Sequence, residues 1–464
     1  MNTLRITPLI LAVALFMENM DATIIATSLA AIAADIGTEP IALKLALTAY
    51  LVALAIFIPI SSWMADRFGA RSVFRWAIVV FIIGSVCCAV SNSLLTFVGS
   101  RFLQGMGGAM MTPIARLVLV RVTPRSQLVD AMAWLSIPGL IGPIVGPPIG
   151  GFITTFASWH WIFLINVPIG LIGILMVNRF LPNWDRVETR RMDFVGFFLA
   201  GTTFAGWVFG ISVLTLPALP ASFGFAALIA GTLAAFAYYR HFKRTEFPLL
   251  DLSLFRFPLF RTTVVAGAFF RFGVGATPFL FPLMLQIAFG FTPFESGSVT
   301  FAGALGAFIA KFFAERILQA QGFKTALLYS TVVTVIGIYA MGVYTPGTPI
   351  PVILAVLVVA GFYQSMFWTA TNVFTFADIE DKDAGQANVI SQVGVQLSLA
   401  IGVALGGGVL EASHLLSGGV EPSLFDFHVA FWVVGTVALV STAIFWRLPK
   451  LAGSAISGHG APAE

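Results

Sequence analysis

Charge is scarce in this sequence. Of the 464 residues, only 10% are Asp, Glu, Lys or Arg and 58% are hydrophobic, whereas about 25% charged residues is usual for a soluble domain. Apolar runs recur along almost the whole chain and leave no room for a soluble catalytic domain of the usual ~100 residues or more. The composition therefore predicts an integral membrane protein, and any chemistry takes place within the membrane.

Residues that mark other classes of protein are also missing. The two cysteines, Cys87 and Cys88, are neighbours in an apolar run, where a disulfide between them is geometrically unfavourable. The five histidines are dispersed without metal-binding spacing, and no phosphate-binding glycine loop is present, which argues against an ATP-driven pump. We predict no metal, no cofactor and no enzymatic activity. A net charge of +4, scattered over short loops, argues against a nucleic-acid surface.

Fourteen apolar runs are each long enough to cross a bilayer. They lie near residues 8–32, 44–64, 73–91, 94–120, 131–154, 160–181, 193–214, 221–241, 260–288, 296–314, 325–344, 350–374, 387–412 and 428–447. Basic residues follow the even-numbered spans up to span eight, while the alternate loops contain almost none beyond Lys44. Because basic loops stay in the cytoplasm, we expect a multi-pass protein with both termini cytoplasmic.

The longest loops follow the sixth and eighth spans. We therefore predict an all-α membrane protein with an N-terminal six-helix bundle at 1–181, two inserted linker helices within 182–250, a C-terminal six-helix bundle at 251–450 and a disordered tail at 451–464. A faint repeat supports a duplicated unit. Ala65-Asp66-Arg67 with Gly69 and Arg71 ends span two, and Ala314-Glu315-Arg316 with Gly322 and Lys324 ends span ten, if the second copy has a four-residue insertion.

Two carboxylates, Glu18 and Asp21, lie inside the first span. Their spacing places both on one helix face, and a rise of ~1.5 Å per residue puts them near the middle of a hydrocarbon core ~30 Å thick. A charge at this depth costs several kcal/mol unless it faces a partner or water, so an acid there is a functional hypothesis. In span four, Arg101 lies at the depth of Asp21 and Gln104 at that of Glu18. This permits an ion pair, which is either a proton site or a static structural pair.

The second half of the chain has a basic residue at a corresponding depth. Arg271 in span nine could bind an anionic group of a substrate or pair with Glu18, whereas Lys311 is expected to snorkel to the cytoplasmic side. Most aromatic residues on such helices pack against protein or lipid, but a few could line an apolar site with some polar groups. The predicted substrate contacts are Arg271, Gln104, Phe270, Gln286, Tyr363 and Trp368.

Three segments resemble signatures of the major facilitator superfamily. Ser62–Arg71 is similar to its loop-two signature, in which Gly69 makes a tight turn and Asp66, Arg67 and Arg71 form an inner gate. The alternative interpretation of these charges is positive-inside topology alone. Arg101–Gly105 is similar to the second signature.

Gly142–Gly151 in span five resembles the antiporter signature of the same superfamily. Glycines allow close helix approach and prolines remove backbone hydrogen bonds, so we predict a hinge or seal between the bundles rather than a generic kink. The residues of this predicted hinge are Gly142, Pro143, Gly146, Pro147, Gly150 and Gly151.

Two further segments, Asp21–Ile25 and Trp159–Gly170, resemble the fourteen-helix drug:proton antiporters of the EmrB/QacA type, and Pro278–Gln286 with Ala310-Lys311 is similar to their MdtD-like branch. The resemblance implies a major facilitator fold with fourteen helices (6+2+6) and two pseudo-symmetric bundles. It also implies a monomeric, proton-coupled multidrug efflux antiporter of the bacterial inner membrane that works by alternating access on small-molecule substrates.

In that comparison Asp21, Glu18 and Arg101 form the proton-coupling group, although the family often has Gln where this chain has Glu18. The alternative function is a proton-coupled exporter of anionic metabolites such as organic acids. A membrane-embedded enzyme or a receptor is a remote alternative, because no nucleophile, metal or cofactor cluster lies at one depth.

Overall fold

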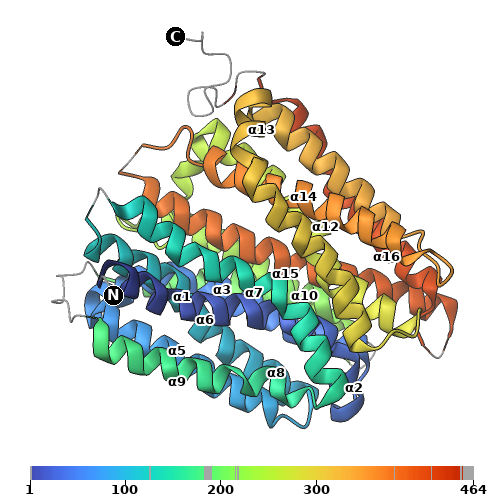
Figure 1. Ribbon diagram of the computed structural model, residues 1–464. Coiled ribbons are helices and arrows are strands. Elements are labelled where there is room, and N and C mark those ends of the chain that lie inside the picture. The colour runs from blue at the N-terminus through green and yellow to red at the C-terminus, as the bar shows by residue number, and fades with distance from the viewer. Residues whose placement is uncertain are drawn as a thin grey trace. The chain divides into compact units, whose positions relative to one another are not determined.

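The computed structural model describes residues 3–124, 127–181, 191–214, 216, 219–380, 382–419, 421–449 and 452. Every regular element within these residues is a helix (Figure 1). The predicted disordered tail at 451–464 lies, apart from residue 452, outside the described residues, as does most of the loop after the sixth span.

The helices follow one another in the order expected from the apolar runs. The first part of the chain forms α1 (Thr3–Ile24), α2 (Leu29–Ile36), α3 (Lys44–Phe57), α4 (Ser61–Phe68), α5 (Ala70–Ala89), α6 (Leu94–Val122), α7 (Leu128–Phe156), α8 (His160–Leu164) and α9 (Asn166–Phe180). Short 3-10 turns η1 (Ile25–Thr27), η2 (Pro40–Leu43) and η3 (Ile58–Ile60) join the earlier ones. Next come α10 (Phe194–Leu214), α11 (Ala221–Phe242) and η5 (Leu252–Arg256). The last part forms α12 (Pro258–Ile287), α13 (Pro293–Met341), α14 (Ile350–Phe374), α15 (Ala384–Ser417) and α16 (Leu424–Trp446).

Thirteen helices in the described part of the chain are long and apolar enough to cross a membrane. The fourteenth predicted span is present within α13, which runs for 49 residues but leaves helical geometry at Gly322, where φ is 72° and ψ is 167°. The residues before and after Gly322 therefore form two arms, which correspond to spans ten and eleven. The chain is a multi-pass membrane protein, and the prediction of fourteen spans agrees with this division.

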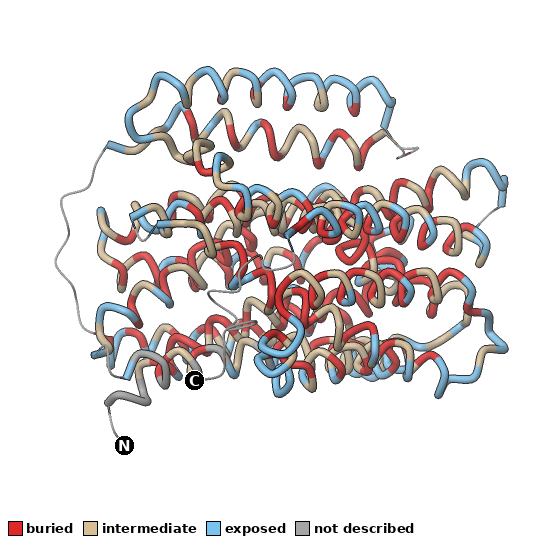
Figure 2. Tube along the Cα trace, turned by 90° about the horizontal axis from the view of Figure 1, so that it is seen from above, coloured by how far each residue is buried: buried red, intermediate tan, exposed pale blue. Residues whose placement is uncertain are grey.

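The outward faces of the helices are apolar. Figure 2 shows exposed positions, in pale blue, alternating with buried positions, in red, along most helices. On α11 the exposed positions are large hydrophobic side chains: Phe223, Phe225, Ile229, Leu233 and Phe236. Such a surface is unfavourable in water but matches lipid acyl chains.

Close contacts divide the chain into two compact units. Unit 1 comprises Met1–Gly206, Ile229–Leu249 and Thr292–Gly297, and unit 2 comprises Trp207–Leu228, Leu250–Phe291 and Ser298–Glu464. The inserted helices α10 and α11 contribute to both units. The division at 1–181, 182–250 and 251–450 stays a prediction.

The two units repeat one structural device. Gly69 separates α4 from α5 with φ 89°, as Gly322 separates the two arms of α13. Two residues after each glycine, a basic side chain donates a hydrogen bond to a backbone carbonyl at the end of another helix. Arg71 Nη2 lies 2.6 Å from the carbonyl oxygen of Asn178 near the end of α9, and Lys324 Nζ lies 2.6 Å from that of Leu448 just beyond α16. Because carbonyls at a helix C-terminus lack partners and carry partial negative charge, Arg71 caps the end of α9 and Lys324 caps the end of α16.

This repeat corrects the register inferred from the sequence. With the glycines and the capping residues aligned, the second copy needs no four-residue insertion. Gln319, three residues before Gly322, then takes the place of Asp66, and Glu315 does not. Glu315 instead accepts a hydrogen bond from Gln319 Nε2 at 3.2 Å. The letters Ala-Asp-Arg and Ala-Glu-Arg are similar, but the physical feature that the two turns share is a glycine with positive φ.

We expect Gly322→Ala to destabilise the protein by about 1–3 kcal/mol, because the conformation at this residue is essentially restricted to glycine. Thermal unfolding in detergent should show a lower melting temperature. Gly385→Ala on α15 is the control, since an added methyl group there meets no atom within 4 Å. Equal melting temperatures for the two variants would contradict the strain assigned to Gly322.

Candidate functional site: a buried carboxylate network in unit 1

Three helices of unit 1 meet at the carboxylate of Asp21 on α1. Its Oδ2 accepts a hydrogen bond from Arg101 Nη1 of α6 at 2.6 Å, and its Oδ1 accepts from Gln104 Nε2 at 2.7 Å and from Asn166 Nδ2 of α9 at 2.8 Å. All four residues are at most 1% exposed. Three donors, one of which carries a full positive charge, thus compensate a charge that would otherwise be strongly disfavoured away from water.

A second layer of groups holds the donors in place. Ser85 Oγ on α5 accepts hydrogen bonds from Gln104 Nε2 at 2.7 Å and from Asn166 Nδ2 at 3.3 Å. Arg101 also donates to Gln104 Oε1. The guanidinium carbon lies 4.3 Å from the centre of the Tyr50 ring, a distance at which the ring attracts a cation. We call these residues, Asp21, Arg101, Gln104, Asn166, Ser85 and Tyr50, the Asp21 network.

The Asp21 network retains unused hydrogen-bonding capacity. Within the described part of the chain, Arg101 Nε, Asn166 Oδ1 and the Tyr50 hydroxyl are buried without a partner. Buried polar groups are nearly always satisfied in folded proteins, and exceptions call for a functional explanation or a water molecule. These atoms are therefore places where water or a rearranged side chain could bind.

Glu18 lies next to the Asp21 network but has its own partner. Its Oε2 accepts a hydrogen bond from Thr112 Oγ1 of α6 at 2.8 Å, and the side chain is half-buried. A methyl group added at Gly108 would lie 3.1 Å from the Tyr50 hydroxyl and 3.7 Å from Glu18 Cγ. Tyr50 and Glu18 thus approach one another at the space that Gly108 leaves open, and Tyr50 also contacts Arg101.

The sequence-based expectations for this region are met in part. The ion pair between Asp21 and Arg101, which matched depths permit, is present. Gln104 is predicted as a substrate contact, whereas the structure places its amide inside the Asp21 network. Asn166, Ser85 and Thr112 were missed. Each is a polar residue inside an apolar span, so depth counting on spans three, four and six would have brought them to notice.

In unit 2, Arg271 on α12 is a buried cation. It is 4% exposed, and its guanidinium carbon lies 5.5 Å from the centre of a ring of Trp368 on α14. Among the described residues, no hydrogen bond or ion pair to its guanidinium group is present. Beside it is a cavity of about 10 Å³, room for roughly one water molecule. The structure thus brings together two of the predicted substrate contacts.

The other predicted substrate contacts in unit 2 are not part of the cavity beside Arg271. Phe270 is fully buried and stacks on Phe367 with ring centres 3.8 Å apart. Gln286 is half-buried near the end of α12, and Tyr363 lines a different cavity on α14. Lys311 donates a hydrogen bond to Thr369 Oγ1 at 2.9 Å.

The predicted gate residues surround the turn at Gly69. Asp66 Oδ1 accepts a hydrogen bond from Arg121 Nη2 at the end of α6 at 2.6 Å, and both side chains are about one-third exposed. Arg67 is exposed, and Arg71 caps α9 as described above. The acid therefore pairs across helices with Arg121, and not with the neighbouring arginines of its own loop.

Glycines of α7 allow this helix to lie directly against α1. A methyl group added at Gly142 would lie 2.9 Å from the backbone nitrogen of Met20, and one at Gly150 would lie 2.9 Å from Thr27 Oγ1. At Gly146 it would collide with Thr23 Oγ1. Helix α1 is thus held between α7 on one side and α6, which contacts both acids, on the other. Any displacement of α7 has to move α1 or separate this contact.

The remaining residues of the predicted hinge complete the face of α7. Gly151 lies against the backbone of Pro293 at the start of α13, and the carbonyl of Pro147 accepts a hydrogen bond from Thr27 Oγ1 at 3.5 Å. The helix continues through Pro143 and Pro147.

Among the described residues, no three His, Cys, Asp or Glu side chains are grouped so that they could hold a metal ion.

A double-mutant cycle measures the ion pair of the Asp21 network. We expect Asp21→Asn to lower stability by about 3–5 kcal/mol, because Arg101 would be left as an uncompensated buried charge. Asp21→Asn with Arg101→Gln should be less destabilised than the sum of the single variants. The same cycle on the exposed pair Asp66 and Arg121 should give only about 0–1 kcal/mol. Thermal unfolding in detergent provides the comparison, and additive effects at Asp21 and Arg101 would contradict the coupling.

Comparison with known proteins places this geometry in a family. The family model described as Major Facilitator Superfamily matches residues 11–254 and 263–461. The chain is 34% identical over 442 residues to the probable transport protein HsrA of Haemophilus influenzae. The matched region covers 95% of this chain and 94% of the relative. It is 35% identical over 455 residues to the putative multidrug resistance protein MdtD of Salmonella heidelberg, with coverage of 95% and 94%.

Solved structures agree on the fold. A D-xylose-proton symporter has a TM-score of 0.70 at 14% identity and covers 96% of this chain and 98% of its own. A peptide transporter of the POT family, solved with sulfate, has a TM-score of 0.70 at 14% identity with coverage of 95% and 93%. Fold, family model and relatives support a membrane transporter, and the chain belongs to the Major Facilitator Superfamily.

Proposed function

We propose that this protein is a proton-coupled multidrug efflux antiporter of the bacterial inner membrane that works by alternating access. The similarity to proteins named as putative multidrug resistance proteins supports the substrate class. The observation that carries the proposal is the buried pair of Asp21 and Arg101, held by amide donors in the middle of membrane-spanning helices.

A purely structural ion pair is the competing interpretation of the Asp21 network. Such a network is most stable when all its members are satisfied, because the low dielectric makes an unpaired polar group costly. The unpartnered atoms of Arg101, Asn166 and Tyr50 favour a network that has a second arrangement. This is the expected property of a site that exchanges a proton during transport.

In the proposed cycle, Asp21 binds a proton from the outside and releases it to the cytoplasm. Protonation removes the charge that compensates Arg101, so the present arrangement becomes unfavourable and a conformation with better solvation of Arg101 gains population. Substrate binds the deprotonated form and favours the opposite change. Coupling of the two flows then follows from the different affinities of the two conformations for proton and substrate.

Helix α1 is the proposed mechanical link. It carries both acids on the face toward α6, and its opposite face lies in close contact with the glycines of α7. A rearrangement of the Asp21 network that shifts α1 is thereby transmitted to α7. We propose Glu18 as a second proton site on the same helix. The Tyr50 side chain lies between Glu18 and Arg101 and approaches both.

We expect Asp21→Asn to abolish ethidium uptake by everted membrane vesicles that are energised by a proton gradient. The amide keeps the shape of the carboxyl group but cannot exchange a proton. Glu246→Gln is the control, because this carboxylate is exposed and lies outside the Asp21 network. Ethidium binding to the purified variant, followed by fluorescence, checks that the protein is folded. Gradient-driven uptake at the wild-type rate in Asp21→Asn would refute the proposed role.

Export of anionic metabolites is the second candidate function. It is favoured by the burial of Arg271 without an acidic partner among the described residues, because a carboxylate substrate would compensate this charge. The two candidates differ in the charge of the transported molecule.

The second candidate predicts uptake of radiolabelled succinate by energised everted vesicles. Arg271→Gln should then lower the uptake at least about tenfold, because hydrogen bonds to a charged group contribute ~1.5–3 kcal/mol. Arg261→Gln, an exposed position on the same helix, should have little effect. Wild-type vesicles that take up ethidium but not succinate would eliminate this candidate.

A further inference from the structure

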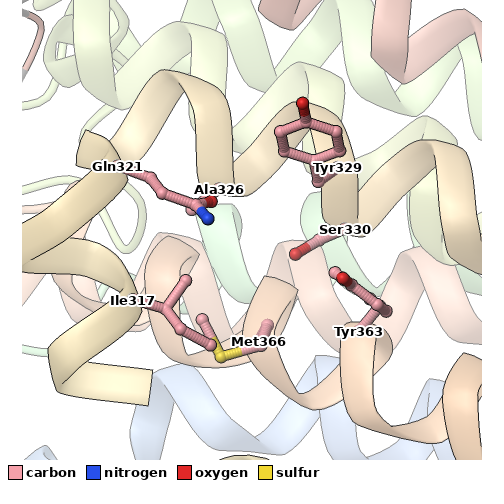
Figure 3. A pocket seen from close by; sticks show the side chains of 7 residues that line it. All are labelled: Ile317, Gln321, Ala326, Tyr329, Ser330, Tyr363 and Met366. Carbon is pink, nitrogen blue, oxygen red and sulfur yellow. The ribbon is translucent and has the colours of Figure 1, made fainter. Parts of the chain in front are cut away.

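A cavity of about 180 Å³ lies within unit 2, beside the turn at Gly322. Figure 3 shows it between the two arms of α13 and the helix α14. Ile317 and Gln321 come from the first arm, Ser330 from the second, and Tyr363 and Met366 from α14. The turn at Gly322 separates the arms, so the same backbone feature that divides spans ten and eleven opens this space.

Three polar groups point into the cavity. In Figure 3 the amide of Gln321 and the hydroxyls of Ser330 and Tyr363 extend toward one another. None of these groups makes a hydrogen bond to another described residue. Ser330 is only 1% exposed, so its hydroxyl is largely shielded from bulk solvent and faces the cavity. Because buried hydroxyls normally have a partner, this arrangement indicates that something else supplies one.

The rest of the wall is apolar and uncharged. Ile317, Ala326 and Met366 supply the apolar part of the wall, and the exposed side chain of Tyr329 also lines the cavity. No charged side chain lines the cavity. A charged ligand would be desolvated without a counter-ion, so the occupant is expected to be neutral.

Size and hydrogen bonding restrict the occupant further. A cavity of ~150 Å³ holds one benzene molecule, so this space accommodates one six-membered ring with a small substituent. A lipid acyl chain would leave the buried hydroxyl of Ser330 without a hydrogen-bond partner, at a cost of roughly 1–3 kcal/mol.

We propose that this cavity is a binding site for a neutral phenol-type compound. The aromatic ring packs between Ile317 and Met366, whose sulfur makes favourable contacts with aromatic rings. The hydroxyl group of the ligand bonds to Ser330 and Tyr363, and Gln321 offers a further donor and acceptor. The site is separate from the Asp21 network and from Arg271, and its occupancy does not depend on proton coupling or on the direction of transport.

Photolabelling of the full-length protein in lipid nanodiscs tests this site. The probe is 4-azidophenol, and mass spectrometry locates the labelled peptides. We expect saturable labelling of the segments around Ile317–Ser330 and Tyr363–Met366, prevented by excess phenol. Toluene, which has the ring and lacks the hydroxyl, should compete about three- to tenfold less well, the fold-change of one or more lost hydrogen bonds.

Matched variants separate the polar contacts from general partitioning into lipid. Ser330→Ala and Tyr363→Phe each remove one oxygen atom and should weaken saturable labelling about three- to tenfold. Tyr339→Phe is the control. Tyr339 lies on α13 outside the cavity lining, and its hydroxyl forms a hydrogen bond of 2.9 Å with Thr436 Oγ1 on α16. Melting temperatures verify the fold of each variant, and either variant suffices if the other is unstable. Labelling that does not saturate, equal competition by toluene, or unchanged labelling in the folded variants would overturn the proposal.

Discussion

The burial of one negative charge, on Asp21, is the constraint on which unit 1 depends. A carboxylate without water is tolerated only when charge and hydrogen bonds compensate it. Arg101, Gln104 and Asn166 do so from two other helices, and Ser85 orients the amides from a third. The relative positions of α1, α5, α6 and α9 are therefore linked to the chemistry of a single group.

Hydrogen bonds of this length require helices that approach closely, and glycines provide the approach. A methyl group at Gly84 of α5 would lie 2.6 Å from the backbone of Gln104, and one at Gly105 of α6 would lie 2.6 Å from the carbonyl oxygen of Tyr50. Membrane helices have no water-driven hydrophobic attraction for one another, so packing between small residues has to supply much of their association. The glycines thus set the distances between helices that the hydrogen bonds of the polar residues require.

The two units share a backbone design and differ in their charges. In both, a glycine with positive φ ends one span, and a basic residue two positions later caps the end of another helix, α9 in unit 1 and α16 in unit 2. Unit 1 then places a compensated acid among its helices, whereas unit 2 buries Arg271 without an acidic partner among its described residues. A turn at glycine follows from the local conformation that the backbone has to adopt. The buried charges are not part of this turn, and they differ between the two units.

The sequence by itself determined the number of spans, the helical class and the family, and it placed Asp21 and Arg101 at the same depth, which permits an ion pair. These features follow from hydropathy, from glycine and proline segments and from the helical rise, all of which are local or one-dimensional properties. Only the tertiary structure decided that Gln104 joins the network, that Asn166 and Ser85 belong to it and that Gln319 occupies the place of Asp66. It also decided that Ser330 and Tyr363 face one cavity. These facts depend on how helices rotate about their axes and on which neighbours they contact, and depth along a single helix carries no information about rotation.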